Sequence, residues 1–163
     1  MSSLKKKTAI GSVGVVVIVL LLMLTYIFNN QTEKEYTPDV FLDTPIYELN
    51  GSEFEIPKYK DELVFVFFNS NCHFCEEEAE NISKNHSKLN DLLVVFVSNE
   101  APELIKKISQ NYSNLRFLYD KDSKLTDELN ISNYPTTFKV SLKRNTVKKY
   151  KGLIDYKVLL ANE

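Results

Sequence analysis

Asn69–Glu78, with the sequence NSNCHFCEEE, contains both cysteines of this 163-residue chain. It follows Leu63–Phe68 (LVFVFF), a short continuous run of β-branched and aromatic residues that is typical of a strand buried on both faces. It leads into Glu76–Ser87, which is rich in helix formers and has neither glycine nor proline. Cys72 is therefore predicted to lie where a strand ends and a helix begins.

The two cysteines are spaced for redox chemistry. At a strand–helix junction the first backbone N–H groups of the helix are unpaired and the helix dipole is positive, so a thiolate on Cys72 is favoured. Cys75 lies one turn further on the same side of the helix and can close a disulfide with Cys72. A purely structural bridge is the alternative, but so short a loop restricts the unfolded chain little. The pair indicates a dithiol centre with Cys72 as nucleophile and Cys75 as resolving cysteine.

The composition bounds the class of protein. Hydrophobic residues make up 44% of the chain and aromatic residues 12%, enough for a globular core. The formal net charge is −2, and Lys5–Lys7 are the only charged residues before Glu33. Without these lysines the chain has no basic excess, so nucleic-acid binding is not supported.

Residues 8–28 contain no charged residue and are long enough, as a helix, to span a bilayer. The lysines directly before them place the N-terminus in the cytoplasm by the positive-inside tendency. A cleaved signal peptide is the alternative, but the apolar run is long and lacks a small-x-small cleavage pattern. We predict a cytoplasmic tail (1–7), a single-pass anchor in the cell membrane (8–28), a polar tether (29–39) and an extracytoplasmic domain (40–163), periplasmic or on the outer face.

Strands alternate with helices in this domain, and a hairpin comes near its end. This order predicts an α/β three-layer sandwich with a mixed sheet. The expected elements are a hairpin of Ile46–Leu49 and Glu53–Ile56 around Asn50-Gly51, strand Leu63–Phe68, helix Cys72–His86, strand Leu92–Val97, a helix from Pro102, strand Leu115–Tyr119, a short helix Ser123–Leu129 capped by Asp122 or Ser123, strands Thr136–Leu142 and Val147–Tyr150, and helix Asp155–Ala161.

A C-x-x-C after a buried strand, followed later by Tyr134-Pro135-Thr136 before another strand, resembles the thioredoxin superfamily. Within it, the chain is similar to the membrane-anchored TlpA-like/redoxin thiol–disulfide oxidoreductases, over roughly Val40–Leu160. The resemblance implies a thioredoxin-like fold with an N-terminal β-hairpin, here preceded by one transmembrane helix. It also implies that Cys72 and Cys75 are the active-site pair.

The resemblance assigns further residues to the site. Pro135 matches the family's cis-proline, and Glu78 matches an acidic residue that tunes the cysteines by relaying a proton. Substrate contacts are expected from Tyr134, Pro135 and Thr136, and from His73 and Phe74 between the cysteines. Glu78 has a plainer interpretation, as part of a solvated acidic face with its neighbours Glu76, Glu77 and Glu80. The chain departs from the family pattern at Asn71, where an aromatic residue is common, and at Glu80, where proline is common.

The function that this resemblance implies is extracytoplasmic thiol–disulfide exchange, with reduction of protein disulfides. A transmembrane thiol reductase would supply the electrons, and we expect a monomer with neither cofactor nor metal. A peroxidase of the peroxiredoxin kind is one alternative, although Asn69 stands where that family has Thr or Ser. A copper-delivery module is another, although one C-x-x-C supplies few ligands. The third is a non-catalytic interaction domain.

Overall fold

The computed structural model describes residues 15–25 and 35–161, and the chain divides into two units at Glu35/Tyr36. Residues 15–25 are helical. In the described parts of the chain, no helix is both long and apolar enough to cross a membrane. The predicted tail, both ends of the predicted anchor (8–14 and 26–28) and most of the predicted tether lie outside the described residues.

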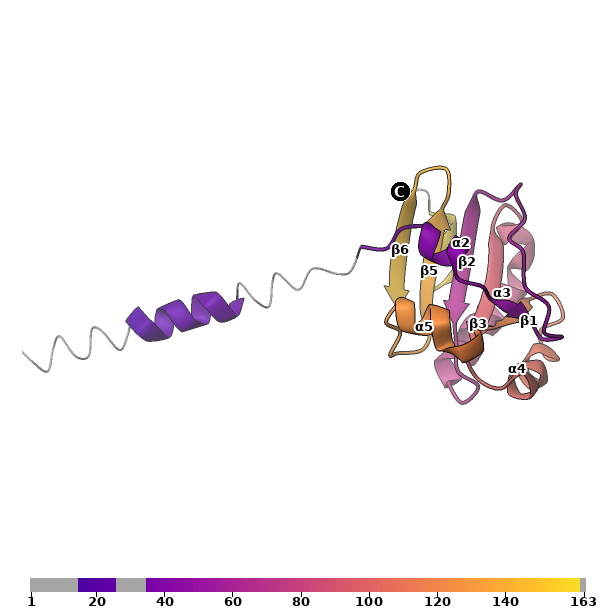
Figure 1. Ribbon diagram of the computed structural model, residues 1–163, viewed down its shortest axis with the longest axis horizontal. Helices are drawn as coiled ribbons and strands as arrows, with labels where there is room; N and C mark the ends of the chain where they lie inside the picture. Colours follow the sequence, from indigo (N-terminus) through magenta and orange to yellow (C-terminus); the bar gives the residue numbers. More distant parts are fainter. Residues whose placement is uncertain (1–14, 26–34, 162–163) are drawn as a thin grey trace, which may run out of the picture. The chain divides into compact units, whose positions relative to one another are not determined.

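The second unit is built on one six-stranded sheet in the order β1-β4-β3-β2-β5-β6 (Figure 1). Strands β2, β3 and β4 run parallel, and the other neighbours pair antiparallel, so the predicted mixed sheet is confirmed. The strands are β1 (Tyr47–Glu48), β2 (Glu62–Phe67), β3 (Leu93–Ser98), β4 (Arg116–Tyr119), β5 (Thr136–Ser141) and β6 (Thr146–Lys151).

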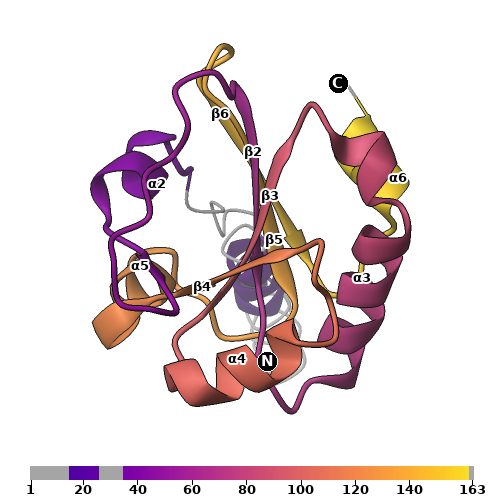
Figure 2. The ribbon, with the colours of Figure 1, turned by 90° about the vertical axis from the view of Figure 1, so that its right-hand side faces the viewer.

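Helices cover both faces of the sheet and make the predicted three layers. Helices α2 and α5 lie on one face, and α3 and α6 lie on the other (Figure 2). The helical segments are α2 (Asp39–Asp43), α3 (His73–Lys84), η1 (His86–Leu89), α4 (Pro102–Ser109), η2 (Lys121–Ser123), α5 (Lys124–Glu128) and α6 (Tyr156–Leu160). The sequence interpretation missed α2, a short helix whose Phe41 is buried among the core aromatic rings.

The central strand β2 is buried on both faces, as predicted. Leu63, Phe65 and Phe67 join the core under α2 and α5, whereas Val64 and Val66 join the core under α3 and α6. This alternation follows from the two-residue period of a strand, and all five side chains have no exposed surface. The strand therefore holds the loop at its carboxyl end in a fixed place.

The predicted hairpin is present but short. Gly51 turns the chain with φ of 88°, the Glu48 N–H donates to the Ser52 carbonyl at 2.8 Å, and the Phe54 N–H donates to the Ile46 carbonyl at 2.8 Å. Beyond this turn, β1 pairs with β4 instead of extending the hairpin.

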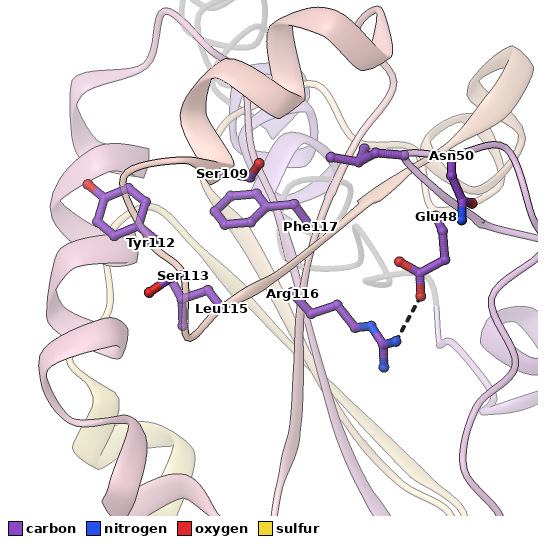
Figure 3. A pocket seen from close by; sticks show the side chains of 9 residues that line it. Glu48, Asn50, Ser109, Tyr112, Ser113, Leu115, Arg116 and Phe117 are labelled. Carbon is purple, nitrogen blue, oxygen red and sulfur yellow. Dashed lines mark ion pairs between the residues drawn. The ribbon is translucent and has the colours of Figure 1, made fainter.

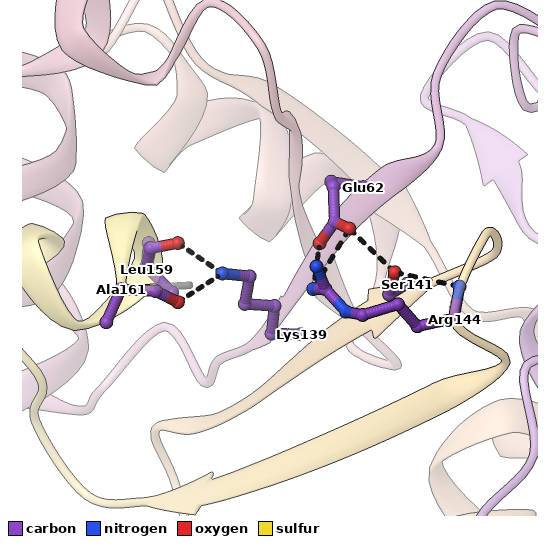
Figure 4. Close-up of polar contacts among 6 residues, drawn as sticks. All are labelled: Glu62, Lys139, Ser141, Arg144, Leu159 and Ala161. Carbon is purple, nitrogen blue, oxygen red and sulfur yellow. Dashed lines mark hydrogen bonds and ion pairs between the residues drawn. The ribbon is translucent and has the colours of Figure 1, made fainter. Parts of the chain in front are cut away.

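A buried lysine ties the last helix to the sheet. Lys139 of β5 donates from Nζ to the carbonyls of Leu159 and Ala161, at 2.8 and 2.9 Å (Figure 4). It thereby satisfies carbonyl groups at the end of α6. On the same sheet, Glu62 accepts from Ser141 at 2.6 Å and pairs with Arg144 at 3.0 Å.

The predicted cap of α5 is confirmed only in position: Ser123 is the N-cap residue, but its side chain makes no capping hydrogen bond. Asp122 and Ser123 have φ of 60° and 56°. Asp120, which has no exposed surface, takes the role from the end of β4: its carboxylate accepts from Leu125 N at 3.0 Å and from Thr126 N and Oγ1 at 2.7 and 2.6 Å.

Asp120→Ala is expected to lower the free energy of unfolding by about 3 kcal/mol, because it leaves buried donors without an acceptor. Urea unfolding measures the change. Asp127→Ala, at an exposed position of the same helix, is the matched control and should cost under about 0.5 kcal/mol. Equal losses in the two variants would contradict this role for Asp120.

Candidate redox site

Cys72 and Cys75 form a disulfide, with their Cα atoms 5.2 Å apart. Cys72 is the N-cap of α3, and its Sγ accepts the Cys75 backbone N–H at 3.2 Å. Cys72 is half-buried, whereas Cys75 is only 3% exposed. The sulfur that a substrate reaches first therefore belongs to Cys72, and the helix N-terminus favours its thiolate.

Two side chains fix the loop between β2 and α3. The Asn71 N–H donates to Asn69 Oδ1 at 3.0 Å. Glu100 accepts from the Ser70 N–H at 2.6 Å and from Ser70 Oγ at 2.7 Å. Glu100 follows β3, the parallel neighbour of β2, so the carboxyl ends of the two strands bring it to this loop. The sequence interpretation missed this residue; an acidic residue just after the second buried strand was the available signal.

The predicted Tyr134-Pro135-Thr136 segment lies at the same edge of the sheet. The peptide bond between Tyr134 and Pro135 is cis. Thr136 pairs with Phe67, the last residue of β2, so Pro135 lies beside the start of the cysteine loop. The Thr136 side chain is 2% exposed and its hydroxyl donates to the Asn133 carbonyl at 2.7 Å, so it holds the segment from inside.

Tyr134 packs against the cores of both faces. Burial, and then the carboxylates of Glu100, Asp120 and Asp127, raise the pKa of its hydroxyl. The tyrosine is therefore neutral over the whole physiological range and can act as a hydrogen-bond donor at this edge.

Glu78 is not on a solvated face. It has no exposed surface, and one carboxylate oxygen accepts from Thr137 Oγ1 at 2.8 Å. The other oxygen, Oε2, is buried with no hydrogen-bond partner among the described residues. Burial raises the pKa of Glu78 to about 7, although the Thr137 hydrogen bond lowers it. A carboxyl one turn from Cys75 is thus poised to exchange a proton near neutral pH.

The remaining predicted residues are at the surface. His73 is exposed and pairs through Nε2 with Glu77 at 3.0 Å. Phe74 is 58% exposed, with its ring centroid 6.0 Å from that of His73. Both side chains stand beside the disulfide, where a docking protein can touch them. Across the part of the chain that the structure describes, no group of three or more His, Cys, Asp and Glu residues is placed to hold a metal ion.

Residues 35–156 match the AhpC/TSA family, which is most of the chain. The chain belongs to this family. None of the curated protein sequences compared with it is significantly similar. With a C-x-x-C disulfide at the end of the central strand, this AhpC/TSA member is a thiol–disulfide oxidoreductase.

Solved structures share the fold. DsbF of Mycobacterium tuberculosis superposes with a TM-score of 0.64 at 17% identity, covering 74% of this chain and 92% of that one. The exposed lipoprotein thioredoxin Etrx1 of Streptococcus pneumoniae gives 0.60 at 20% identity, covering 71% and 93%. Peroxiredoxin Q of Xanthomonas campestris gives 0.62 at 13% identity, covering 77% and 90%. At these identities the likeness establishes the thioredoxin-like fold.

Proposed function

We propose that this AhpC/TSA member reduces protein disulfides outside the cytoplasm, tethered to the membrane by its N-terminal segment. The observation that carries the proposal is the buried carboxyl of Glu78, one turn behind a buried Cys75 whose partner Cys72 is accessible. A purely structural disulfide would not explain why the carboxyl of Glu78 is buried with one oxygen unpartnered, which costs folding free energy.

The chemistry proceeds in two exchanges. The Cys72 thiolate attacks one sulfur of the substrate disulfide, whose other sulfur leaves as a thiolate. Cys75 then gives its proton to the Glu78 carboxylate and attacks Cys72 Sγ, which releases the second substrate sulfur. Two electrons pass from the protein dithiol to the substrate disulfide, and the two substrate thiolates take up the proton that Cys72 lost to solvent and the proton that Cys75 gave to Glu78. The products are the Cys72–Cys75 disulfide and a substrate dithiol.

Negative charge supports the reducing direction. Glu76, Glu77 and Glu80 lie on the first turns of α3, and Glu76 and Glu80 contribute to the raised pKa of the Tyr112 hydroxyl. Such charges oppose thiolate formation at Cys72 and so favour a reducing couple. The electron donor we propose is a transmembrane thiol reductase.

The membrane tether rests on residues 15–25. They are helical, and the side chains of Val15–Leu24 are all apolar and 48–63% exposed. Neutral, lipophilic side chains around a whole helix are typical of a segment in contact with lipid.

Redox titration tests the direction. The full-length chain, equilibrated in graded thiol–disulfide buffers, is expected to show a two-electron transition at or below about −250 mV. A variant with Glu76, Glu77 and Glu80 replaced by Gln should titrate at a less negative potential. A wild-type transition near about −120 mV would instead identify an oxidant that introduces disulfides.

A thiol peroxidase is the second candidate, because the chain shares its fold with peroxiredoxin Q. Asn69 stands where peroxiredoxins have Thr or Ser, and its side-chain oxygen is occupied by the Asn71 N–H. Consumption of hydrogen peroxide by the reduced chain, faster than exchange with a protein disulfide, would favour that second function.

A further inference from the structure

A partly enclosed recess of about 100 Å³ lies directly beside the redox disulfide. Both cysteines line it, together with Glu76 and polar residues of the loops. The rest of its wall is apolar and comes from the end of β2, from β3, from β4, and from α3, α4 and the turn after α4: Phe68, Ala79, Phe96, Ile108, Tyr112 and Phe117. An apolar cavity of about 150 Å³ accommodates benzene, so this one has room for a single aliphatic side chain.

Aromatic packing holds the walls in place. The Phe117 ring lies 5.5 Å from that of Phe68, nearly perpendicular to it, and 5.2 Å from that of Phe96, stacked on it. The Tyr112 ring also stacks on the Phe117 ring, with their centroids 6.3 Å apart. Three of these rings are at most 4% exposed. The recess is therefore preformed, and filling it costs little ordering of the protein.

A substrate disulfide that reacts with Cys72 necessarily brings its neighbouring side chains to the opening of the recess. Any disulfide that reacts must reach Cys72 Sγ, and the residue next to the substrate cysteine is only about 3.5 Å further along the chain. Beyond the recess, a wider open depression of about 580 Å³ shares Tyr112 and Phe117 and extends to the Arg116–Glu48 ion pair (Figure 3). An extended substrate segment can continue along it.

We propose that the recess selects substrates by receiving one apolar side chain that adjoins the reacting cystine of a protein. This specificity site rests on the proposed disulfide reductase function and names its substrate class. The carboxylate of Glu76, which lines the recess, disfavours an acidic residue at the same position.

Peptides with an internal disulfide, identical except for Leu, Ala or Asp next to the first cysteine, test the proposal. Stopped-flow oxidation of the reduced full-length chain gives a second-order rate constant for each peptide. The Leu peptide is expected to react about tenfold or more faster than the Ala peptide, and the Asp peptide slowest, because burial of the larger apolar side chain stabilises the transition state.

Variants of α4 connect this preference to the recess. Ile108→Phe fills the recess and should reduce the Leu-to-Ala ratio to near one, chiefly by slowing the reaction of the Leu peptide. Ile108→Ala enlarges it and should move the preference to a Phe peptide. Leu104→Ala, an exposed position on the same helix outside the recess, should keep the tenfold ratio.

Each result has a distinct meaning. Wild-type rate constants within twofold of one another for Leu and Ala peptides, with exchange proceeding, overturn the recess as a specificity site and leave the reductase function standing. A tenfold preference that survives both Ile108 substitutions also overturns it. Failure of every peptide to exchange, together with a potential near that of an oxidant, overturns both proposals.

Discussion

Cys75→Ser is expected to trap substrate proteins as mixed disulfides on Cys72, whereas Cys72→Ser should reduce disulfide exchange at least about a thousand-fold. The physical reason is the difference in access: Cys72 is half-buried at the start of α3, and Cys75 is 3% exposed beneath it. With serine at 75 the second exchange has no attacking thiol, so the intermediate persists. Non-reducing electrophoresis of the reduced chain mixed with a disulfide protein measures the adduct.

The double serine variant is the matched control and should form no adduct. Dithiothreitol must also reduce the mixed disulfide and release the substrate protein from the adduct. If Cys72→Ser forms the adduct and Cys75→Ser does not, the roles of the two cysteines are reversed. If the reduced wild-type chain reduces no protein disulfide and neither single variant forms an adduct, the pair is a structural bridge.

The central strand and the strand–helix junction were predictable because they follow from local patterns, whereas the segment around Pro135 was recognised through the family resemblance. Burial of Glu78 had a local signal too. It lies three residues after Cys75 and one before Ala79, inside the apolar stripe that Ile82 continues, so helical periodicity alone turns it inward. The acidic residues that flank Glu78 in the sequence, by contrast, favour the interpretation that Glu78 lies on a solvated face of the helix.

Other parts of the site depend on which strands become neighbours. Glu100 reaches the cysteine loop only because β3 pairs in parallel with β2, and Asp120 reaches α5 only because β4 ends beside it. The recess exists because α4, β4 and α3 converge on Phe117. Local propensity contains none of these long-range placements, which is why Asp120 was not predicted to accept the first N–H groups of α5.

The free energy of unfolding of the wild-type chain is expected to fall between pH 4.5 and pH 7, and Glu78→Gln should remove most of this fall. The pKa of Glu78 is about 7 in the folded protein and 4.5 as the ordinary value, so the unfolded chain loses its proton first as the pH rises. The folded state is therefore unaffected below pH 4.5, loses stability progressively up to pH 7, and stays lower above it. At 1.36 kcal/mol for each unit of pKa, the loss is about 3 kcal/mol. Denaturant unfolding of the oxidised chain at pH 4 and pH 8 measures it.

The same substitution separates a proton relay from a merely structural carboxyl. Release of glutathione from a mixed disulfide on Cys72 reports the Cys75 attack, and its rate should rise through pH 7 in the wild type. Glu78→Gln should slow this step by about a hundred-fold above pH 7 and flatten the profile, since an amide accepts no proton.

Thr137→Val removes the hydrogen bond that lowers the pKa of Glu78, so it should move the pH profile of glutathione release to higher pH. Glu80→Gln, at a 56% exposed position of the same helix, should leave the position of the profile nearly unchanged. If Glu78→Gln keeps the wild-type rate and profile while its stability changes as described, the proton of Cys75 goes to solvent and Glu78 acts through stability alone.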